Sequence, residues 1–394
     1  MGRAEVVATA DRTGARPWVA VAAVAVGTFL LVTAEQLPVG LLTPVGADLG
    51  VTDGVAGLMV TVPGIVAAVA APSVPMLVGR LDRRVLLGAL VALMTLANAV
   101  SALAPTYPVL LASRVLVGVA IGGFWAVAGG LAMRLVPRRG VPRATAVIFG
   151  GVAAANVLGV PIGTLLGGLA GWRAAFGALG GLAAVVTVAL FALLPRLVAG
   201  RPVRPGALLA QLRGPAVATG ILVTLLVVTG HFAAYTFVSP VLQDRAGVPA
   251  AFVGPLLLGF GAAGIVGNFV AGAAVARRLH RTVLGIVLAL ALVLAFYPLL
   301  GATAVGGTLL LLLWGLAYGG VSVSLQSWMI AAAPRAVEAA TSLWVSVFNL
   351  AIGLGALVGG LVVDNTALVG VLWLAAALFL LSAVAVAAGV RHGG

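Results

Sequence analysis

One acidic residue, Glu35, is the strongest indication of chemistry in this chain. It lies within an apolar stretch that runs from about Trp18 to Leu42 and has no other charged residue. A carboxylate at the centre of a membrane-spanning helix costs roughly 2.5–3.5 kcal/mol on insertion scales. Groups kept at that cost are usually functional, and proton or cation binding is the usual function. We therefore expect Glu35 to bind and release a proton.

A second titratable residue, His231, occupies the matching position in the second half of the chain. The segment LLVTAE ends at Glu35 and the similar segment LVVTGH ends at His231, 196 residues later (231 − 35). Imidazole titrates near neutral pH, so His231 is a second candidate for proton coupling. The interpretation we favour for His231 is a hydrogen bond to a substrate.

The third intramembrane candidate is Arg114, near the start of the fourth apolar stretch. At about 1.5 Å per residue, Glu35 and Arg114 should lie roughly 8–9 Å below the same membrane edge, and His231 roughly 12–14 Å below it. A nearby guanidinium favours a charged carboxylate and burial favours a neutral one, so the pair could load and release a proton. The alternative for Arg114 is that its head extends to the interface.

The elements that position these residues are membrane-spanning helices. The chain has 394 residues, of which 62% are hydrophobic and 8% charged, whereas soluble domains are about 25% charged. Apolar runs of about 18 residues or more recur along the chain, and they predict an all-α integral membrane protein. We expect twelve spans, at about 18–41, 55–78, 85–103, 109–133, 144–168, 174–194, 215–240, 252–275, 282–300, 304–331, 341–362 and 368–390.

The charges are distributed asymmetrically between alternate loops. The arginine-rich loops hold Arg3, Arg12, Arg16, Arg80, Arg83, Arg84, Arg134, Arg138, Arg139, Arg143, Arg196, Arg201, Arg204, Arg213, Arg277, Arg278, Arg281, Arg335 and Arg391. The opposite loops hold Arg173 and Arg245 with Asp48, Asp53, Asp244 and Asp364. This positive-inside pattern predicts that both termini are cytoplasmic in a bacterial inner membrane. It also accounts for the net charge of +13 without a nucleic-acid partner.

The chain divides into two similar halves. Residues 1–194 and 214–394 each contain six expected spans, and the Arg- and Pro-rich stretch 195–213 reads as a cytoplasmic linker. Because six is an even number, both halves would cross the membrane in the same direction, as parallel repeats. With no cysteine and only three histidines, we expect no disulfide, metal site or cofactor.

Several motifs resemble those of the major facilitator superfamily of transporters. The stretch GRLDRR at 79–84 resembles the family's loop between spans two and three, and RVLVGVAIG at 114–122 resembles its signature in span four. The resemblance implies a gating loop of Gly79, Arg80, Asp82, Arg83 and Arg84 that docks near Thr341 in one access state. It also associates Arg114 with proton coupling.

The fifth span resembles the signature of proton-driven exporters. Its glycines and proline are Gly159, Pro161, Gly163 and Gly167, although Val160 stands where that pattern usually has glycine. Proline permits a kink, and the glycines would present a smooth face to another helix. More narrowly, the chain resembles the drug:proton antiporter branch, including efflux permeases for arabinose, purine nucleosides and chloramphenicol.

Polar and aromatic residues on apolar helices are the candidate substrate cavity. They are Gln36, Trp125, Asn156, His231, Tyr235, Asn268, Tyr318, Gln326, Trp344 and Asn349. Such residues can also simply join helices. For this architecture the default site lies near the midplane between the halves.

We therefore interpret the chain as a monomeric, proton-coupled exporter of a small neutral or weakly charged molecule, working by alternating access. The substrate would be a drug, a nucleoside or a sugar-like compound. The alternative within transport is a proton symporter or uniporter that imports a nutrient. A more distant alternative is a membrane-embedded enzyme or sensor, and we do not expect an enzyme because no catalytic cluster is visible in the sequence.

Overall fold

A computed structural model describes residues 15–78, 81–128, 131–197, 206 and 210–391, and no strand occurs among them. The helical elements between residues 15 and 193 form what we call the first bundle. Its members are α1 (Ala15–Leu49), α2 (Asp53–Ala56), α3 (Leu58–Leu77), α4 (Arg83–Leu103), α5 (Tyr107–Ala128), α6 (Ala132–Leu135), η1 (Arg138–Gly140), α7 (Val141–Ala154), η2 (Ala155–Gly159), α8 (Val160–Ala170) and α9 (Trp172–Leu193).

The remaining elements form the second bundle. They are η3 (Gln211–Arg213), α11 (Pro215–Tyr235), α12 (Val238–Pro240), η4 (Val241–Arg245), α13 (Ala250–Leu300), α14 (Ala304–Gly319), α15 (Val321–Ala332), α16 (Val337–Asn365) and α17 (Gly370–Arg391). The prediction of an all-α fold is confirmed.

The number of spans follows from one kinked helix. Eleven described helical stretches are long and apolar enough to cross a membrane. One of them, α13, has 51 residues, about 77 Å at 1.5 Å per residue, more than twice the thickness of a hydrocarbon core. Its helical geometry breaks at Arg278 (φ −148°, ψ 63°), between the predicted eighth and ninth spans. Two spans therefore come from α13, and the total is twelve.

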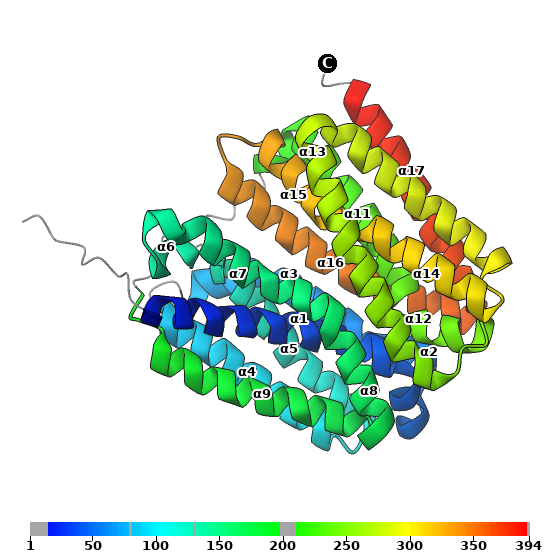
Figure 1. Cartoon of the computed structure of the whole chain (residues 1–394), viewed down its shortest axis with the longest axis horizontal. Helices are drawn as coiled ribbons and strands as arrows, with labels where there is room; N and C mark the ends of the chain where they lie inside the picture. Colours follow the sequence, from blue (N-terminus) through cyan, green and yellow to red (C-terminus); the bar gives the residue numbers. More distant parts are fainter. Residues whose placement is uncertain (1–14, 79–80, 129–130, 198–205, 207–209, 392–394) are drawn as a thin grey trace, which may run out of the picture.

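The two bundles lie side by side (Figure 1), the first coloured blue to green and the second green to red. In the first bundle α3 packs on α5 and α4 on α9, and in the second α11 packs on α16 and α17. Between the bundles α3 packs on α16, and α8 with η2 packs on α13. At Gly64 an added Cβ would lie 2.7 Å from the backbone nitrogen of Gly353, so these two glycines allow α3 and α16 to come close.

Alternate helix ends gather at opposite ends of the molecule. We call one the arginine-rich end, where α1 begins and α15 is followed by α16. The other is the acidic end, where helical segments begin or end at or near four aspartates, Asp48, Asp53, Asp244 and Asp364. In Figure 1 the acidic end is at the lower right, around α2 and α12.

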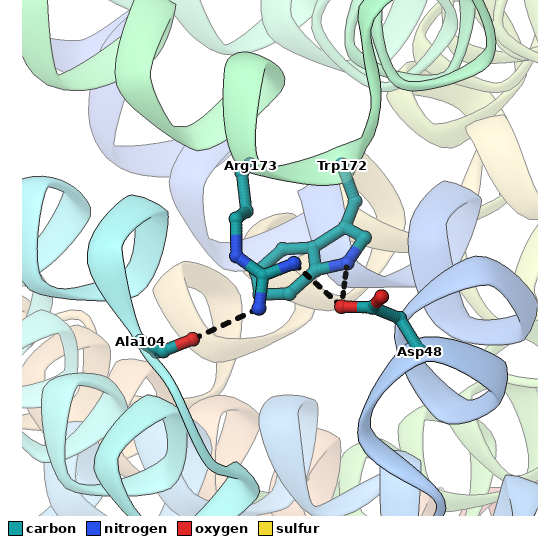
Figure 2. Close-up of polar contacts among 4 residues, drawn as sticks. All are labelled: Asp48, Ala104, Trp172 and Arg173. Carbon is teal, nitrogen blue, oxygen red and sulfur yellow. Dashed lines mark hydrogen bonds and ion pairs between the residues drawn. The ribbon is translucent and has the colours of Figure 1, made fainter.

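A polar contact ties three elements of the first bundle together at the acidic end (Figure 2). Asp48 accepts hydrogen bonds from the indole nitrogen of Trp172 (3.1 Å) and from Arg173 (2.5 Å), and Arg173 also donates to the carbonyl of Ala104 (3.1 Å). The turn before them needs a positive φ, which Gly171 supplies (84°). The ion pair is half exposed, with side chains at 42% and 46%, so it orients the loops and contributes only about 0–1 kcal/mol to stability.

Candidate functional site

Glu35 and Arg114 are both buried inside the first bundle. The Glu35 side chain, on α1, is 6% exposed and Arg114, on α5, is 0% exposed. The two groups interact electrostatically, but these two described residues share neither a hydrogen bond nor a close ion pair. Glu35 Oε1 and Arg114 Nη1 each lack a hydrogen-bond partner in the protein. The carboxyl group is therefore not held in one fixed bond.

Arg114 donates its other hydrogen bonds to two backbone carbonyls that lack their usual helical N–H partner because a proline stands four residues later. Its Nη2 donates to the carbonyl of Ala34 (2.6 Å) and its Nε to that of Met59 (3.1 Å). In a helix these carbonyls would accept from the residues four positions on, which are Pro38 and Pro63. Proline has no N–H, so both carbonyls would be orphaned. Arg114 therefore clamps α1 and α3 to α5 at the depth of Glu35.

The sequence shows that each proline removes the N–H partner of a carbonyl four residues earlier. It does not show which side chain donates to that carbonyl instead.

Tyr107, at the start of α5, adds a similar contact: its hydroxyl donates to the carbonyls of Val55 (2.5 Å) and Ala56 (3.3 Å). Sequence reasoning did not single out this tyrosine.

In the second bundle His231 lies inside an aromatic cluster, which we define as His231, Tyr235, Phe260, Trp314 and Tyr318. The indole N–H of Trp314 donates to Nδ1 of His231 (3.1 Å). The imidazole is stacked on Tyr318, with ring centroids 3.3 Å apart and planes 7° apart. Tyr235 also stacks on it, at 4.9 Å.

The hydrogen bond from Trp314 fixes the state of the imidazole. An indole nitrogen can only donate, so Nδ1 of His231 must present a lone pair and its proton must reside on Nε2. The side chain is 1% exposed, and the described rings that surround it carry no charge near neutral pH. The arrangement therefore favours a neutral His231 with a structural role. It does not favour the role of proton carrier that the sequence suggested for this residue.

The cluster also lies near the buried acid of the other bundle. Gln36, which follows Glu35, donates to Asn156, and an added Cβ at Gly261, next to Phe260 of the cluster, would lie 2.7 Å from the carbonyl oxygen of Asn156. Tyr318 is half-buried, and among the described rings it contacts only His231. The structure thus brings the candidate coupling residue of the first bundle close to three of the cavity residues predicted in the second, His231, Tyr235 and Tyr318.

Two further predicted cavity residues meet at an irregular turn of the fifth span. Gln36 donates to the side-chain oxygen of Asn156 (2.9 Å). Asn156 lies in η2, a five-residue π-helix between α7 and α8. Such single-turn π segments are frequent at functional sites. Gln36 directly follows Glu35, so this bond lies beside the buried acid.

The other predicted cavity residues are spread over several helices. Asn349 is 5% exposed and donates to the carbonyl of Val345 four residues earlier. Trp344 packs on Phe348, with centroids 5.3 Å apart, and its indole nitrogen has no partner. Trp125 packs on Phe149 (6.0 Å). Asn268 is exposed and Gln326 half-buried.

The predicted gating loop is only partly described, since Gly79 and Arg80 lie outside the described residues. Asp82 accepts from the backbone nitrogens of Arg84 (2.8 Å) and Leu197 (3.0 Å), so it caps α4 and holds the segment after α9. Arg84 donates to the carbonyl of Phe191, and Arg83 is 7% exposed. These contacts are all inside the first bundle. The docking near Thr341 that the family resemblance implied stays a prediction.

The glycines of the antiporter-like motif face α1. An added Cβ at Gly159 would meet Thr33, one at Gly163 would meet Leu37, and one at Gly167 would meet Leu41. Both series advance four residues at a time, which is the spacing of one helix face. Pro161 is buried in the same segment. The motif therefore forms the surface on which α1, the helix of Glu35, packs.

A contact between the bundles at the acidic end was not foreseen from the sequence. Asp364, at the end of α16, accepts from the hydroxyl of Thr52 (2.8 Å) and from the backbone nitrogen of Gly54 (3.1 Å). Thr52 is also the N-cap of α2. Asp53 interacts electrostatically with Asp364 and with Asp244. Both hydrogen bonds to Asp364 cross between the bundles.

Comparisons with known proteins agree on one family. A sequence model described as Major Facilitator Superfamily matches residues 24–339. The chain is 39% identical to the transcription regulatory protein OpdE of Pseudomonas aeruginosa, over 93% of this chain and 92% of that protein. It is 36% identical to the purine ribonucleoside efflux pump NepI of Salmonella paratyphi B, over 96% of this chain and 95% of that one.

The fold is also found among solved structures. A bacterial homolog of the human lysosomal transporter Spinster, solved in an inward-facing and occupied conformation, superposes with a TM-score of 0.77 at 15% identity. The match covers 95% of this chain and 97% of that chain. At this identity the likeness shows the arrangement of helices alone.

Proposed function

Since this chain belongs to the Major Facilitator Superfamily and is a multi-pass membrane transporter, we propose that it exports a small neutral or weakly charged molecule in exchange for protons. Relatives named as purine ribonucleoside efflux pumps, matched over nearly the whole chain, support efflux and make nucleosides the first substrates to test. Drugs and sugar-like compounds are the other members of the panel.

The main support for proton coupling is the environment of the Glu35 carboxyl group. It is buried, it lies near Arg114, and one of its oxygens has no partner in the protein. An acid held in a rigid salt bridge would keep one protonation state, whereas one near a guanidinium occupied elsewhere can change state. Glu35 is the proton carrier in this proposal, and Arg114 shapes its surroundings.

Alternating access would be a rocking of the two bundles. We propose functional units at 1–194 and 214–394, joined by a linker at 195–213, with the arginine-rich end in the cytoplasm of a bacterial cell and the protein acting as a monomer. The hydrogen bonds from Thr52 and Gly54 to Asp364 join the bundles at the acidic end. They support a state closed to the outside.

The test is proton movement in everted membrane vesicles. Vesicles with an acid interior, read by a fluorescent dye, would receive nucleosides, pentoses, chloramphenicol and lipophilic cations one at a time. A substrate should collapse the gradient with the wild type and fail to do so with Glu35→Gln. The matched control is Asp244→Asn, the same acid-to-amide change at an exposed site. Collapse with Glu35→Gln would exclude Glu35 as the carrier, and no collapse with any compound would contradict proton-coupled export.

Two alternatives have distinct signatures. An importing symporter or uniporter with Glu35→Gln would keep downhill exchange and lose inward accumulation. The relative named a transcription regulatory protein raises a sensory role, for which a compound would bind the purified protein without moving protons or itself across vesicles.

A further inference from the structure

We propose that the face of Tyr318 opposite His231 is the stacking surface for a planar heteroaromatic ring of the substrate, with Glu35 accepting a hydrogen bond from that ring. The inference rests on the transport function proposed above and specifies its substrate class. It commits to a flat, nitrogen-containing ring that carries N–H donors, such as a nucleobase, in preference to a sugar.

The first argument is the geometry of Tyr318. One face of its ring is covered by the imidazole of His231, at 3.3 Å and nearly parallel. No other described ring contacts Tyr318, and the residue is only half-buried. The face opposite His231 is therefore not covered by another described ring. Aromatic rings left open in this way bind bases by stacking, without dependence on base sequence.

The second argument is the rigidity of what lies behind it. Trp314 donates to Nδ1 of His231, and Tyr235 stacks on the imidazole at 4.9 Å. Phe260 stacks on Tyr235 at 4.9 Å. These contacts hold the imidazole neutral and in place, so Tyr318 is supported by a fixed stack. A preorganised surface loses little entropy on binding.

The third argument is the polar group beside the surface. The two bundles meet beside the cluster, because Gln36, which follows Glu35, donates to Asn156 and an added Cβ at Gly261, next to Phe260, would lie 2.7 Å from the carbonyl oxygen of Asn156. Glu35 is buried with Oε1 unpartnered. A carboxylate accepts hydrogen bonds and cannot donate them, so it selects a ring edge with N–H groups. When Glu35 is protonated it loses acceptor capacity, which would make proton and substrate compete for one group.

The experiment is direct binding of radiolabelled guanosine to the purified full-length protein, measured by scintillation proximity without any proton gradient. Tyr318→Phe keeps the ring and should bind within about threefold of the wild type. Tyr318→Leu should bind about tenfold or more weakly, the size of a lost base–aromatic stack. The control is Trp373→Leu, which removes an aromatic side chain from the surface of α17, where it is 49% exposed, and should change nothing.

A second arm needs no variant, in case Tyr318→Leu does not fold. On the wild type, the free base guanine should displace labelled guanosine and ribose should not. Displacement by ribose as strong as by guanosine, undiminished binding to folded Tyr318→Leu, or no guanosine binding to the wild type would each overturn the proposal. If guanosine does not bind and a pentose or chloramphenicol still collapses the vesicle gradient through Glu35, the stacking surface is wrong while the export function stands.

Discussion

The hydroxyl of Thr52 donates a 2.8 Å hydrogen bond to the carboxylate of Asp364, which lies 312 residues later in the chain. Together with the bond from the backbone of Gly54, it attaches the short helix α2 of the first bundle to the end of α16 in the second. Asp364 thus binds the N-terminus of a helix, where a negative charge is favoured. This contact should hold the acidic end closed.

Replacing Asp364 by Asn should therefore loosen the acidic end. The chain has no cysteine, so a single Phe237→Cys reporter can be labelled cleanly. Phe237 is buried and its ring lies against Gly57 of the other bundle. We expect maleimide labelling several times faster in the Asp364→Asn background, because one charge-assisted acceptor is lost. The same change at the exposed Asp244 should leave the rate unaltered; equal rates in both backgrounds would remove Asp364 from any closing role.

The clamp made by Arg114 should show energetic coupling to the prolines that it serves. Arg114→Gln should lower the thermal stability of the purified protein, since buried hydrogen bonds to a charged donor contribute about 1.5–3 kcal/mol each. With Pro38→Ala and Pro63→Ala, the helices can satisfy the carbonyls of Ala34 and Met59 themselves. In that background the loss caused by Arg114→Gln should be clearly smaller, as measured by a double-mutant cycle. Strictly additive effects would contradict the clamp.

The protonation state of His231 can be observed directly. The chain has three histidines, so ¹⁵N-histidine labelling with His231→Phe as the assignment control is practical. We expect Nε2 protonated and Nδ1 unprotonated from about pH 6 to pH 8, because the Trp314 N–H occupies Nδ1. Tyr235 and Tyr318 are the other titratable groups against this ring, and both are neutral in that range. A titration of His231 within it would return this residue to the list of proton carriers.

Two neighbouring glycines provide a matched test of the motif in the fifth span. Gly163→Ala should lower thermal stability, because its Cβ would press on Leu37 of α1 and such overpacking costs typically about 1–3 kcal/mol. At Gly168 nothing lies within 4 Å of an added Cβ, so Gly168→Ala should be neutral or slightly stabilising. Thermal unfolding of both variants in detergent would compare them. Equal stability would mean that α1 and α8 have room to separate.

Much of the fold was predictable because the bilayer imposes a simple rule. Every span needs about twenty apolar residues with its backbone satisfied internally, so the spans follow from hydropathy. The boundary between the eighth and ninth was also correct, although the helix is continuous there except for the kink at Arg278. Glu35, Arg114 and His231 were identifiable for the same reason: polar groups are rare at that depth.

The sequence by itself determined the architecture, the family and which buried polar residues deserved attention. Only the tertiary structure decided their partners: Arg114 donates to carbonyls freed by Pro38 and Pro63, Trp314 donates to Nδ1 of His231, and Asp364 accepts from Thr52. The physical reason is that hydropathy and helix period depend on neighbours within one segment, whereas a hydrogen bond depends on the rotation and depth of two helices packed against each other. Those are set by side-chain packing across the whole bundle.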